Sequence, residues 1–147
     1  MEQFLDRHRT LGLDTSVFIY YVEENPKYLE LVRPIFVRLE RPRIQAVTST
    51  ITMLELLVQP YTLPDIDRVN EFYALLSTYP NMDWIPPTLE IADRAAMLRA
   101  EFHLQTPDAI QAATALLSQA TGFVSNDPAF RKVPGLEVVI LDDLSPK

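Results

Sequence analysis

The stretch from Thr106 to Asp127, TPDAIQAATALLSQATGFVSND, contains the alternation of helix and strand that decides the fold class. Thr106-Pro107-Asp108 predicts a helix start, because it combines a cap hydroxyl, a proline for the first turn and an acid near the positive end of the helix dipole. Residues 109–120 are rich in alanine and apolar on most sides, so this helix should lie largely inside, against a sheet. Residues 122–127 follow as a strand that ends in polar side chains.

The same alternation continues outward to both ends of the chain. Further apolar runs predict strands at residues 10–14, 44–50, 82–85 and 137–141. Helical patterns predict helices at residues 17–22, 53–58, 64–78 and 87–103, another that starts at Asn25-Pro26, and a short helical turn at Pro128. This order favours an α/β domain with a mainly parallel sheet and helices on both faces. Because no linker divides the chain, we expect a single domain over residues 1–147.

Several helix boundaries are predicted from individual residues. Thr15 or Ser16 should cap the helix over 17–22. Pro34 should break or kink the helix that starts at Asn25-Pro26, and Pro60 should end the helix over 53–58. The helix over 64–78 should turn one apolar face toward the core, made of Ile66, Val69, Phe72, Tyr73 and Leu76.

Composition restricts the chemistry that the chain can perform. Without cysteine it has no disulfides, thiolate zinc sites or cysteine nucleophiles, and only two histidines disfavour a histidine-based metal site. Because there is neither a transmembrane run nor a signal-peptide pattern, we expect a soluble, cytoplasmic protein with no membrane contact. The net charge of −7 by itself disfavours a nucleic-acid partner, but two bound divalent ions would reduce it to −3.

Four acids are expected to meet at one edge of the sheet. Asp14 ends the first predicted strand and Asp127 ends a later one. Glu55 lies in the helix directly after the second strand, and Asp108 lies in the first turn of a helix that enters from the same edge. Ligands of open parallel sheets gather beyond the carboxyl ends of the strands. Carboxylates without cysteine or paired histidine suit Mg²⁺ or Mn²⁺, which can activate water and stabilise the charge that grows on a phosphodiester under attack.

Each acid also has a structural explanation. Asp108 and Asp127 stand beside prolines and could serve as helix starts, and Asp14 could be a turn residue at a strand end. Glu55 differs because apolar residues flank it from 53 to 58, so its helix should offer almost no solvated face. A buried carboxylate needs a cation or a strong hydrogen-bond partner, which favours metal binding at Glu55 over a buried salt bridge.

At these acids the sequence resembles the PIN-domain nucleases, and within them the VapC-type toxins of prokaryotic toxin–antitoxin pairs. Four segments carry the resemblance, in the family's order and over nearly the whole chain. The stretch Pro107 to Ala115, in register with the other three, is the most specific. The segments are Leu13 to Val17, Thr52 to Leu56, Thr106 to Ala115, and Ser125 to Phe130.

The resemblance implies a Mg²⁺- or Mn²⁺-dependent endoribonuclease with a PIN-like fold and a five-stranded parallel sheet. By the same resemblance, Ser16 and Ser125 stand beside metal-site acids and would orient a carboxylate, a metal-bound water or a phosphate, as would Asn126. The family also implies a homodimer, an RNA substrate such as tRNA or rRNA, and a small antitoxin partner. The residues that it assigns to catalysis and metal binding are Asp14, Glu55, Asp108 and Asp127.

Basic residues and rival functions complete the sequence-based hypotheses. Arg99, on the helix before Asp108, and Arg131 and Lys132, after Asp127, are candidate phosphate contacts.

A structure-specific DNA nuclease is the nearest alternative function, but the chain lacks the insertions expected for binding branched DNA. A catalytically silent PIN-like binding module should have lost one or more acids, and a phosphotransfer domain that uses Asp14 should carry an acid two positions on, where Ser16 stands.

Overall fold

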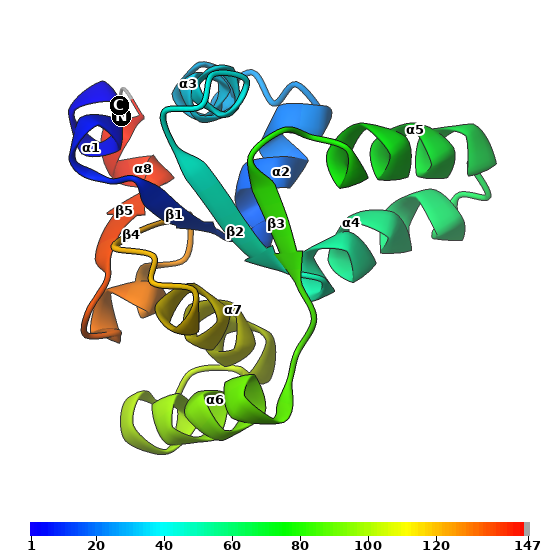
Figure 1. The fold of residues 1–147 in the computed structure, drawn as a ribbon. Helices are drawn as coiled ribbons and strands as arrows, with labels where there is room; N and C mark the ends of the chain where they lie inside the picture. Colours follow the sequence, from blue (N-terminus) through cyan, green and yellow to red (C-terminus); the bar gives the residue numbers. More distant parts are fainter. Residues whose placement is uncertain (146–147) are drawn as a thin grey trace.

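The computed structural model describes residues 1–145 and contains one five-stranded sheet. All neighbouring strands are parallel, and their order is β3-β2-β1-β4-β5 (Figure 1). This confirms the predicted α/β class and places every strand within one or two residues of its expected position. The strands are β1 (Thr10–Leu13), β2 (Gln45–Ser49), β3 (Met82–Ile85), β4 (Gly122–Ser125) and β5 (Glu137–Ile140).

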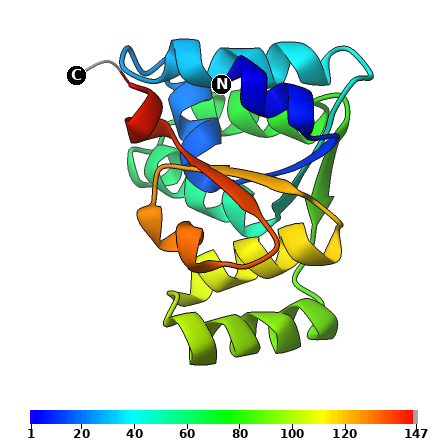
Figure 2. The same cartoon turned by 90° about the vertical axis from the view of Figure 1, so that its left-hand side faces the viewer.

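Helices cover both faces of the sheet. Helices α6 and α7 lie side by side on one face, while α1, α2, α3 and α8 cover the other (Figures 1 and 2). Helices α4 and α5 form a hairpin that extends outward beyond the edge strand β3 (Figure 1). The helices are α1 (Glu2–Arg7), α2 (Thr15–Val22), α3 (Leu29–Leu39), α4 (Ile51–Thr62), α5 (Ile66–Ser77), α6 (Leu89–Phe102), α7 (Thr106–Leu117) and α8 (Leu141–Leu144), with a 3₁₀ turn η1 (Pro128–Lys132).

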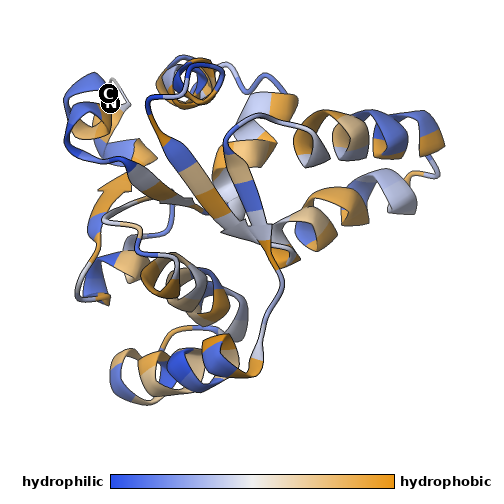
Figure 3. Cartoon of the chain, in the orientation of Figure 1, coloured by the Kyte–Doolittle hydropathy of each residue, from blue (hydrophilic) through white to orange (hydrophobic). Residues whose placement is uncertain are grey.

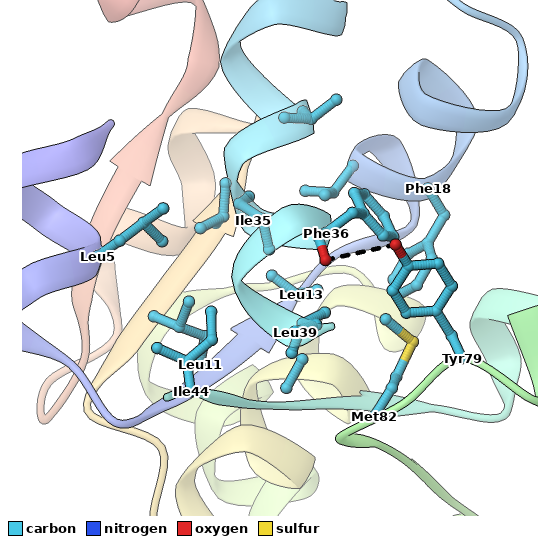
Figure 4. Packing of buried hydrophobic residues seen from close by; sticks show 14 of the residues in the cluster. Leu5, Leu11, Leu13, Phe18, Ile35, Phe36, Leu39, Ile44, Tyr79 and Met82 are labelled. Carbon is cyan, nitrogen blue, oxygen red and sulfur yellow. Dashed lines mark hydrogen bonds between the residues drawn. The ribbon is translucent and has the colours of Figure 1, made fainter. Parts of the chain in front are cut away.

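The strands alternate their side chains between two apolar clusters, as the pleat requires. Leu11 and Leu13 of β1 join the cluster beneath α2 and α3, in which Phe36 is fully buried (Figure 4). In this cluster the Tyr79 hydroxyl donates to the Phe36 carbonyl oxygen at 3.3 Å (Figure 4). The other cluster joins the sheet to α6 and α7, and Phe123 of β4 lies in it.

Gly12 allows α7 to approach the sheet closely. A Cβ at this position would lie 2.7 Å from the Ala115 Cβ and 2.4 Å from Cδ2 of Phe123, both shorter than van der Waals contact. The alanines of α7 complete this fit, because Ala109, Ala112 and Ala113 are wholly buried. The prediction that the alanine-rich helix lies inside is therefore confirmed.

Several predicted boundaries are wrong because tertiary packing outweighs local signals. Pro34 does not break α3, although the expected alternative of a kink stays a prediction, and Pro60 does not end α4, since both helices continue past their prolines. Helix α3 begins at Leu29, because the Asn25 side chain accepts a hydrogen bond from the Lys27 N–H and forms a turn instead. Helices α1 and α8 were not anticipated.

The predicted inner face of α5 is partly wrong. Val69, Phe72 and Leu76 are buried as expected, but Ile66 and Tyr73 are exposed. Figure 3 shows mixed hydropathy along this helix and many hydrophobic residues on α4. Within residues 1–145, no helix combines the length and apolarity that crossing a membrane requires.

Candidate functional site

Four acidic side chains come from four different elements near the carboxyl edge of the sheet. Asp14 directly follows β1, and Asp127 lies two residues beyond the end of β4. Glu55 is in the second turn of α4, the helix that follows β2, and Asp108 is in the first turn of α7. Because the strands are parallel, these connections all lie at the same edge. The elements therefore place the four predicted acids where a shared ligand could reach them.

The Asp14 carboxylate is fixed by three hydrogen bonds. Its Oδ1 accepts from the Thr15 backbone N–H at 2.8 Å, so Asp14 itself caps α2, and the predicted cap at Thr15 or Ser16 is wrong. Its Oδ2 accepts from the Ser125 hydroxyl at 2.6 Å and from the Ser16 hydroxyl at 3.4 Å. The two serines that flank the acids in sequence thus contact a carboxylate.

Ser125 connects two of the four acids. Its side chain is fully buried, and besides donating to Asp14 its Oγ accepts from the Asp127 backbone N–H at 2.9 Å. Asp127 is exposed and caps η1, where its Oδ1 accepts from the Ala129 N–H at 2.8 Å. The structural role considered for Asp127 is thus present, and it engages one of the two carboxylate oxygens.

Glu55 is exposed, so the prediction that its helix buries it is wrong. The reason is the α4–α5 hairpin, which leaves Leu54 and Val58 at the surface with relative exposures of 63% and 56%. Glu55 is nevertheless oriented, because its Oε1 accepts a hydrogen bond from the Thr15 hydroxyl at 3.0 Å. Thr15 therefore links the helix after Asp14 to the helix that carries Glu55.

Asp108 is half-buried in the first turn of α7. The predicted hydroxyl cap is absent, because Thr106 is the first helical residue and Gln105 at the cap position makes no side-chain bond. Burial and, after it, the negative charges of Asp14, Asp127 and Glu55 together raise the pKa of Asp108 to about 6. A carboxyl that three other acids affect in this way lies within their field.

The pKa of Asp14 is also raised above its ordinary value. Burial is the largest cause that raises the pKa of Asp14, and the charges of Glu55 and Asp127 add to it. The hydrogen bonds that Asp14 accepts act in the opposite direction and do not cancel the rise. The four carboxylates therefore form one electrostatically coupled group.

This donor set fits a hard divalent cation. No basic side chain in residues 1–145 forms a salt bridge with any of the four acids, so their repulsion is uncompensated. As the side chains lie, no three histidines, cysteines or acids of this same range are grouped to hold a single ion. Mg²⁺ commonly keeps several waters and is bound through one or two carboxylates. A site in which one or two carboxylates bind the cation directly, and water completes its coordination, agrees with the lack of a three-ligand group and with the lack of salt bridges in this range.

The remaining predicted residues have different surroundings. The Asn126 amide donates to the Tyr20 hydroxyl at 3.1 Å and its Oδ1 accepts from the Asp142 N–H at 2.8 Å, so it joins β4 to α2 and α8. Arg131 forms an ion pair with Asp143. Lys132 is exposed at the end of η1. Arg99 is exposed too, and its Nε donates to the Leu104 carbonyl oxygen at 3.2 Å, between α6 and α7.

Sequence reasoning missed three polar residues beneath the acids. Thr15, Thr52 and Gln111 are all buried, and hydrogen bonds connect them to the elements that carry the carboxylates. One signal was present in the sequence, since Gln111 is a large polar residue among the alanines of a helix predicted to lie inside. A buried amide of this kind requires partners.

Comparison with known proteins places this geometry in context. The PIN domain family model matches residues 12–136. A toxin–antitoxin complex from Klebsiella pneumoniae contains a chain with 27% identity and a TM-score of 0.64, and the match covers 90% of this chain and 97% of that one.

Two further solved structures share the fold at lower identity. FitAcB from Neisseria gonorrhoeae matches with 21% identity and a TM-score of 0.66, covering 90% of this chain and 97% of the other. VapBC2 from Rickettsia felis, bound to a DNA fragment from its promoter, matches with 15% identity and a TM-score of 0.68, covering 89% and 98%. A search of curated proteins finds no significant match.

Proposed function

The chain belongs to the PIN domain family, and on that premise we propose that it is a Mg²⁺- or Mn²⁺-dependent endoribonuclease, the toxin of a toxin–antitoxin pair. The observation that carries the proposal is the group of Asp14, Glu55, Asp108 and Asp127 at one edge of the sheet. Burial and the repulsion among these acids raise the pKa of Asp14 and Asp108, and no basic side chain within residues 1–145 forms a salt bridge with any of the four. The similarity to a toxin–antitoxin complex at 27% identity supports the toxin assignment.

In this proposal one or two of the four carboxylates would bind the metal directly and the others through bound water, and the metal would supply an activated water and stabilise the charge that develops on the phosphodiester. The protein's own contribution is orientation. Ser125 and the Thr15 N–H fix the two oxygens of Asp14, and the Thr15 hydroxyl fixes Glu55. The pKa of Asp108 is raised to about 6, so this acid holds a proton more readily than an ordinary aspartate when the metal is absent.

We also propose RNA as the substrate and Arg99 and Lys132 as phosphate contacts. Both side chains are exposed on elements that adjoin the acids, since Arg99 lies at the end of α6 before Asp108 and Lys132 follows Asp127 on η1. Arg131 is a weaker candidate because Asp143 already pairs with it.

Purified protein provides the test of nuclease function. Wild type should cleave tRNA or rRNA with Mg²⁺ or Mn²⁺ and not with EDTA, and Asp14→Asn and Asp108→Asn should each lose the activity. Asp93→Asn, an exposed acid on α6, is the matched control and should cleave like wild type. Activity that survives in both site variants would indicate a contaminating nuclease. Cleavage of single-stranded or flap DNA instead of RNA would favour the DNA-nuclease alternative, and folded protein that binds no metal would favour the silent binding module.

The antitoxin is proposed to dock on the apolar surface of the α4–α5 hairpin. Leu54, Val58 and Tyr73 are exposed there, and a pocket of about 460 Å³ beside them is lined by Met53, Leu54, Leu57, Tyr73 and Trp84, with Thr50 and Ser77. Exposed apolar surface of this kind marks an interaction site. Because Glu55 is adjacent to Leu54 on α4, a segment bound here would also lie close to Glu55.

Co-expression with the product of the neighbouring reading frame tests this docking surface. The product should co-purify with wild type and block RNA cleavage, and Val58→Arg should abolish both effects. Val37→Arg is the control, since Val37 is also exposed but lies on α3, outside the surfaces proposed for the antitoxin and for a second copy. A Val58→Arg protein that still binds the product would place the partner elsewhere.

We propose a homodimer as well. Helix α6 exposes Leu89 and Met97, which have relative exposures of 91% and 57%, and this leaves apolar surface for a second copy. Light scattering should give twice the monomer mass for wild type, and Met97→Lys should reduce it toward the monomer. A monomeric wild type at concentrations well above those of the activity assay would exclude the dimer.

A further inference from the structure

A buried polar cluster lies beneath the candidate site, at the point where α4, α7 and the end of β2 meet. Its members are Thr48, Thr52 and Gln111, and each residue is 2% exposed or less. Buried polar side chains are costly unless they are satisfied, and no side-chain polar atom of this kind within residues 1–145 lacks a partner.

Gln111 uses both ends of its amide in this cluster. Its Nε2 donates to the Thr52 Oγ1 at 2.6 Å, and its Oε1 accepts from the Ser49 backbone N–H at 3.1 Å. Thr52 is on α4 and Ser49 ends β2, so one side chain of α7 holds both the last residue of a strand and the first turn of the following helix.

One assignment of the hydroxyl hydrogens satisfies all of these side chains, with the Thr48 Oγ1 also 3.4 Å from the Gln111 Oε1. Thr48 donates to the Leu13 carbonyl oxygen at 2.9 Å, so its Oγ1 accepts the hydrogen of Thr52 across 2.7 Å. Thr52 in turn accepts from Gln111. The single hydrogen of Thr15 then goes to Glu55 at 3.0 Å. Each of these hydroxyls therefore has a defined donor role, and the side chains are fixed in orientation.

The helical register relates this cluster to two of the acids. Gln111 is three residues after Asp108 on α7, and Thr52 is three residues before Glu55 on α4. Residues three apart on a helix share a face. The Gln111–Thr52 bond thus joins the two helices one turn away from each of the carboxylates that they carry.

We infer that Gln111 and Thr52 are positioning residues, which hold Asp108 of α7 and Glu55 of α4 at the separation that divalent-metal binding requires. The inference rests on the proposed metal-dependent nuclease and adds to it residues that touch neither metal nor RNA. Groups that orient metal ligands commonly change metal affinity by about 10- to 100-fold when removed.

Titration of metal-free protein with Mn²⁺ alone, followed by calorimetry, tests the inference without relying on catalysis. Thr52→Val keeps the shape of the side chain and removes the hydroxyl, and Gln111→Leu removes both bonds of the amide. Each should weaken Mn²⁺ binding by about tenfold or more. Thr52→Ser keeps the hydroxyl and should bind Mn²⁺ nearly as wild type does.

Thr114→Val is the matched control for general destabilisation. Thr114 is equally buried on α7, but its hydroxyl donates to the Ile110 carbonyl oxygen of the same helix and joins no other element. This variant should be less stable and yet retain wild-type Mn²⁺ affinity. RNA cleavage in Thr52→Val should recover toward the wild-type rate as Mn²⁺ is raised, because the loss is in metal binding.

The outcomes separate the inference from the function on which it rests. Wild type that binds Mn²⁺ and cleaves RNA, with folded Thr52→Val and Gln111→Leu binding Mn²⁺ equally well, overturns the positioning role alone. An equal loss of affinity in Thr114→Val overturns it too, because the effect is then one of stability. Wild type that binds no Mn²⁺ overturns both the inference and the proposed function. If Gln111→Leu does not fold, the comparison of Thr52→Val with Thr52→Ser decides.

Discussion

Individual carboxyl groups at the edge of the sheet determine how the metal-free protein responds to pH. Asp108 is half-buried and its pKa is raised to about 6, first by burial and then by the charges of Asp14, Asp127 and Glu55. The ordinary pKa of an aspartate is about 3.9. Ionised Asp108 is therefore less favourable in the folded chain than in the unfolded one, and a bound cation would reverse that balance.

The titration of Asp108 should make metal-free wild type more stable at about pH 5 than at about pH 7.5. Its folded-state pKa of about 6 lies above the unfolded value, so the folded chain binds more protons between the two, and stability falls as pH rises through that range. After allowance for partial exposure, we expect a difference of about 1 kcal/mol. Thermal unfolding in EDTA measures it.

Asp108→Asn tests this effect, because it removes the titrating carboxyl and its repulsion with Asp14, Asp127 and Glu55. At neutral pH and without metal it should unfold at a higher temperature than wild type, although it is inactive. Asp93→Asn should not, since that acid is exposed on α6. A metal-free Asp108→Asn protein that is less stable than wild type at neutral pH would contradict the coupling among the four acids.

At the level of elements, the contact between α7 and β1 brings Asp108 toward Asp14. It depends on Gly12, where a Cβ would lie 2.7 Å from the Ala115 Cβ. Elsewhere, packing has overruled local preference, because α3 continues through Pro34 although a proline inside a helix lacks the N–H that the preceding turn would accept. A side chain added at Gly12 should therefore lower the stability of the protein, whereas replacing Pro34 should raise it.

Gly12→Ala should destabilise the protein by about 1–3 kcal/mol, because α7 must move away from the sheet or Phe123 must leave its position. Urea unfolding measures the change. The double variant Gly12→Ala/Ala115→Gly should lose less than the sum of the two single losses, since it removes one of the two clashes. If the losses of stability in the two single variants simply add in the double variant, the close approach of a Gly12 Cβ to Ala115 is not the cause of the destabilisation.

Pro34→Ala should raise the stability of the protein by about 1 kcal/mol, since it restores an N–H donor inside α3 and this gain exceeds the entropy that proline removes from the unfolded chain. Thermal unfolding is the measurement, and nuclease activity should be unchanged because α3 contributes none of the four acids. A lower unfolding temperature would mean that the proline ring itself packs against its neighbours productively.

At the level of the whole molecule, the net charge of the protein has the same sign as the charge of its proposed substrate. The chain carries a net charge of −7, and the proposed RNA substrate is a polyanion. The acids that would hold the metal contribute four of the negative charges, all at one edge of the sheet. Metal binding would therefore change the local field where RNA must approach.

Mg²⁺ should increase the affinity of wild type for a non-cleavable 2′-O-methyl RNA severalfold, beyond the effect of Na⁺ at equal ionic strength. Asp14→Asn/Asp108→Asn should bind the same RNA better than wild type does in EDTA, because two negative charges are removed, and should respond less to Mg²⁺. Fluorescence anisotropy measures both. Equal RNA affinity with and without Mg²⁺ would separate substrate binding from the acidic edge.

Local patterns in the sequence were sufficient for the α/β class and for the parallel sheet. Strands such as Gly122–Ser125 are short apolar runs between turn residues, and their alternation with helices leaves few other arrangements. The candidacy of the four acids also came from sequence, since a residue at the carboxyl end of a parallel strand must lie at the ligand-binding edge. These features depend on interactions close in sequence or on the topology that follows from them.

The environment of each acid was decided by the tertiary structure alone. Glu55 was expected to be buried because its helix is apolar on every side, but α4 extends with α5 beyond the sheet and leaves part of that surface uncovered. The Gln111–Thr52 bond joins residues 59 positions apart, and no local pattern pairs them. Burial and side-chain hydrogen bonds depend on which surfaces meet after the chain has folded, and a periodic pattern marks apolar surface without showing what will cover it.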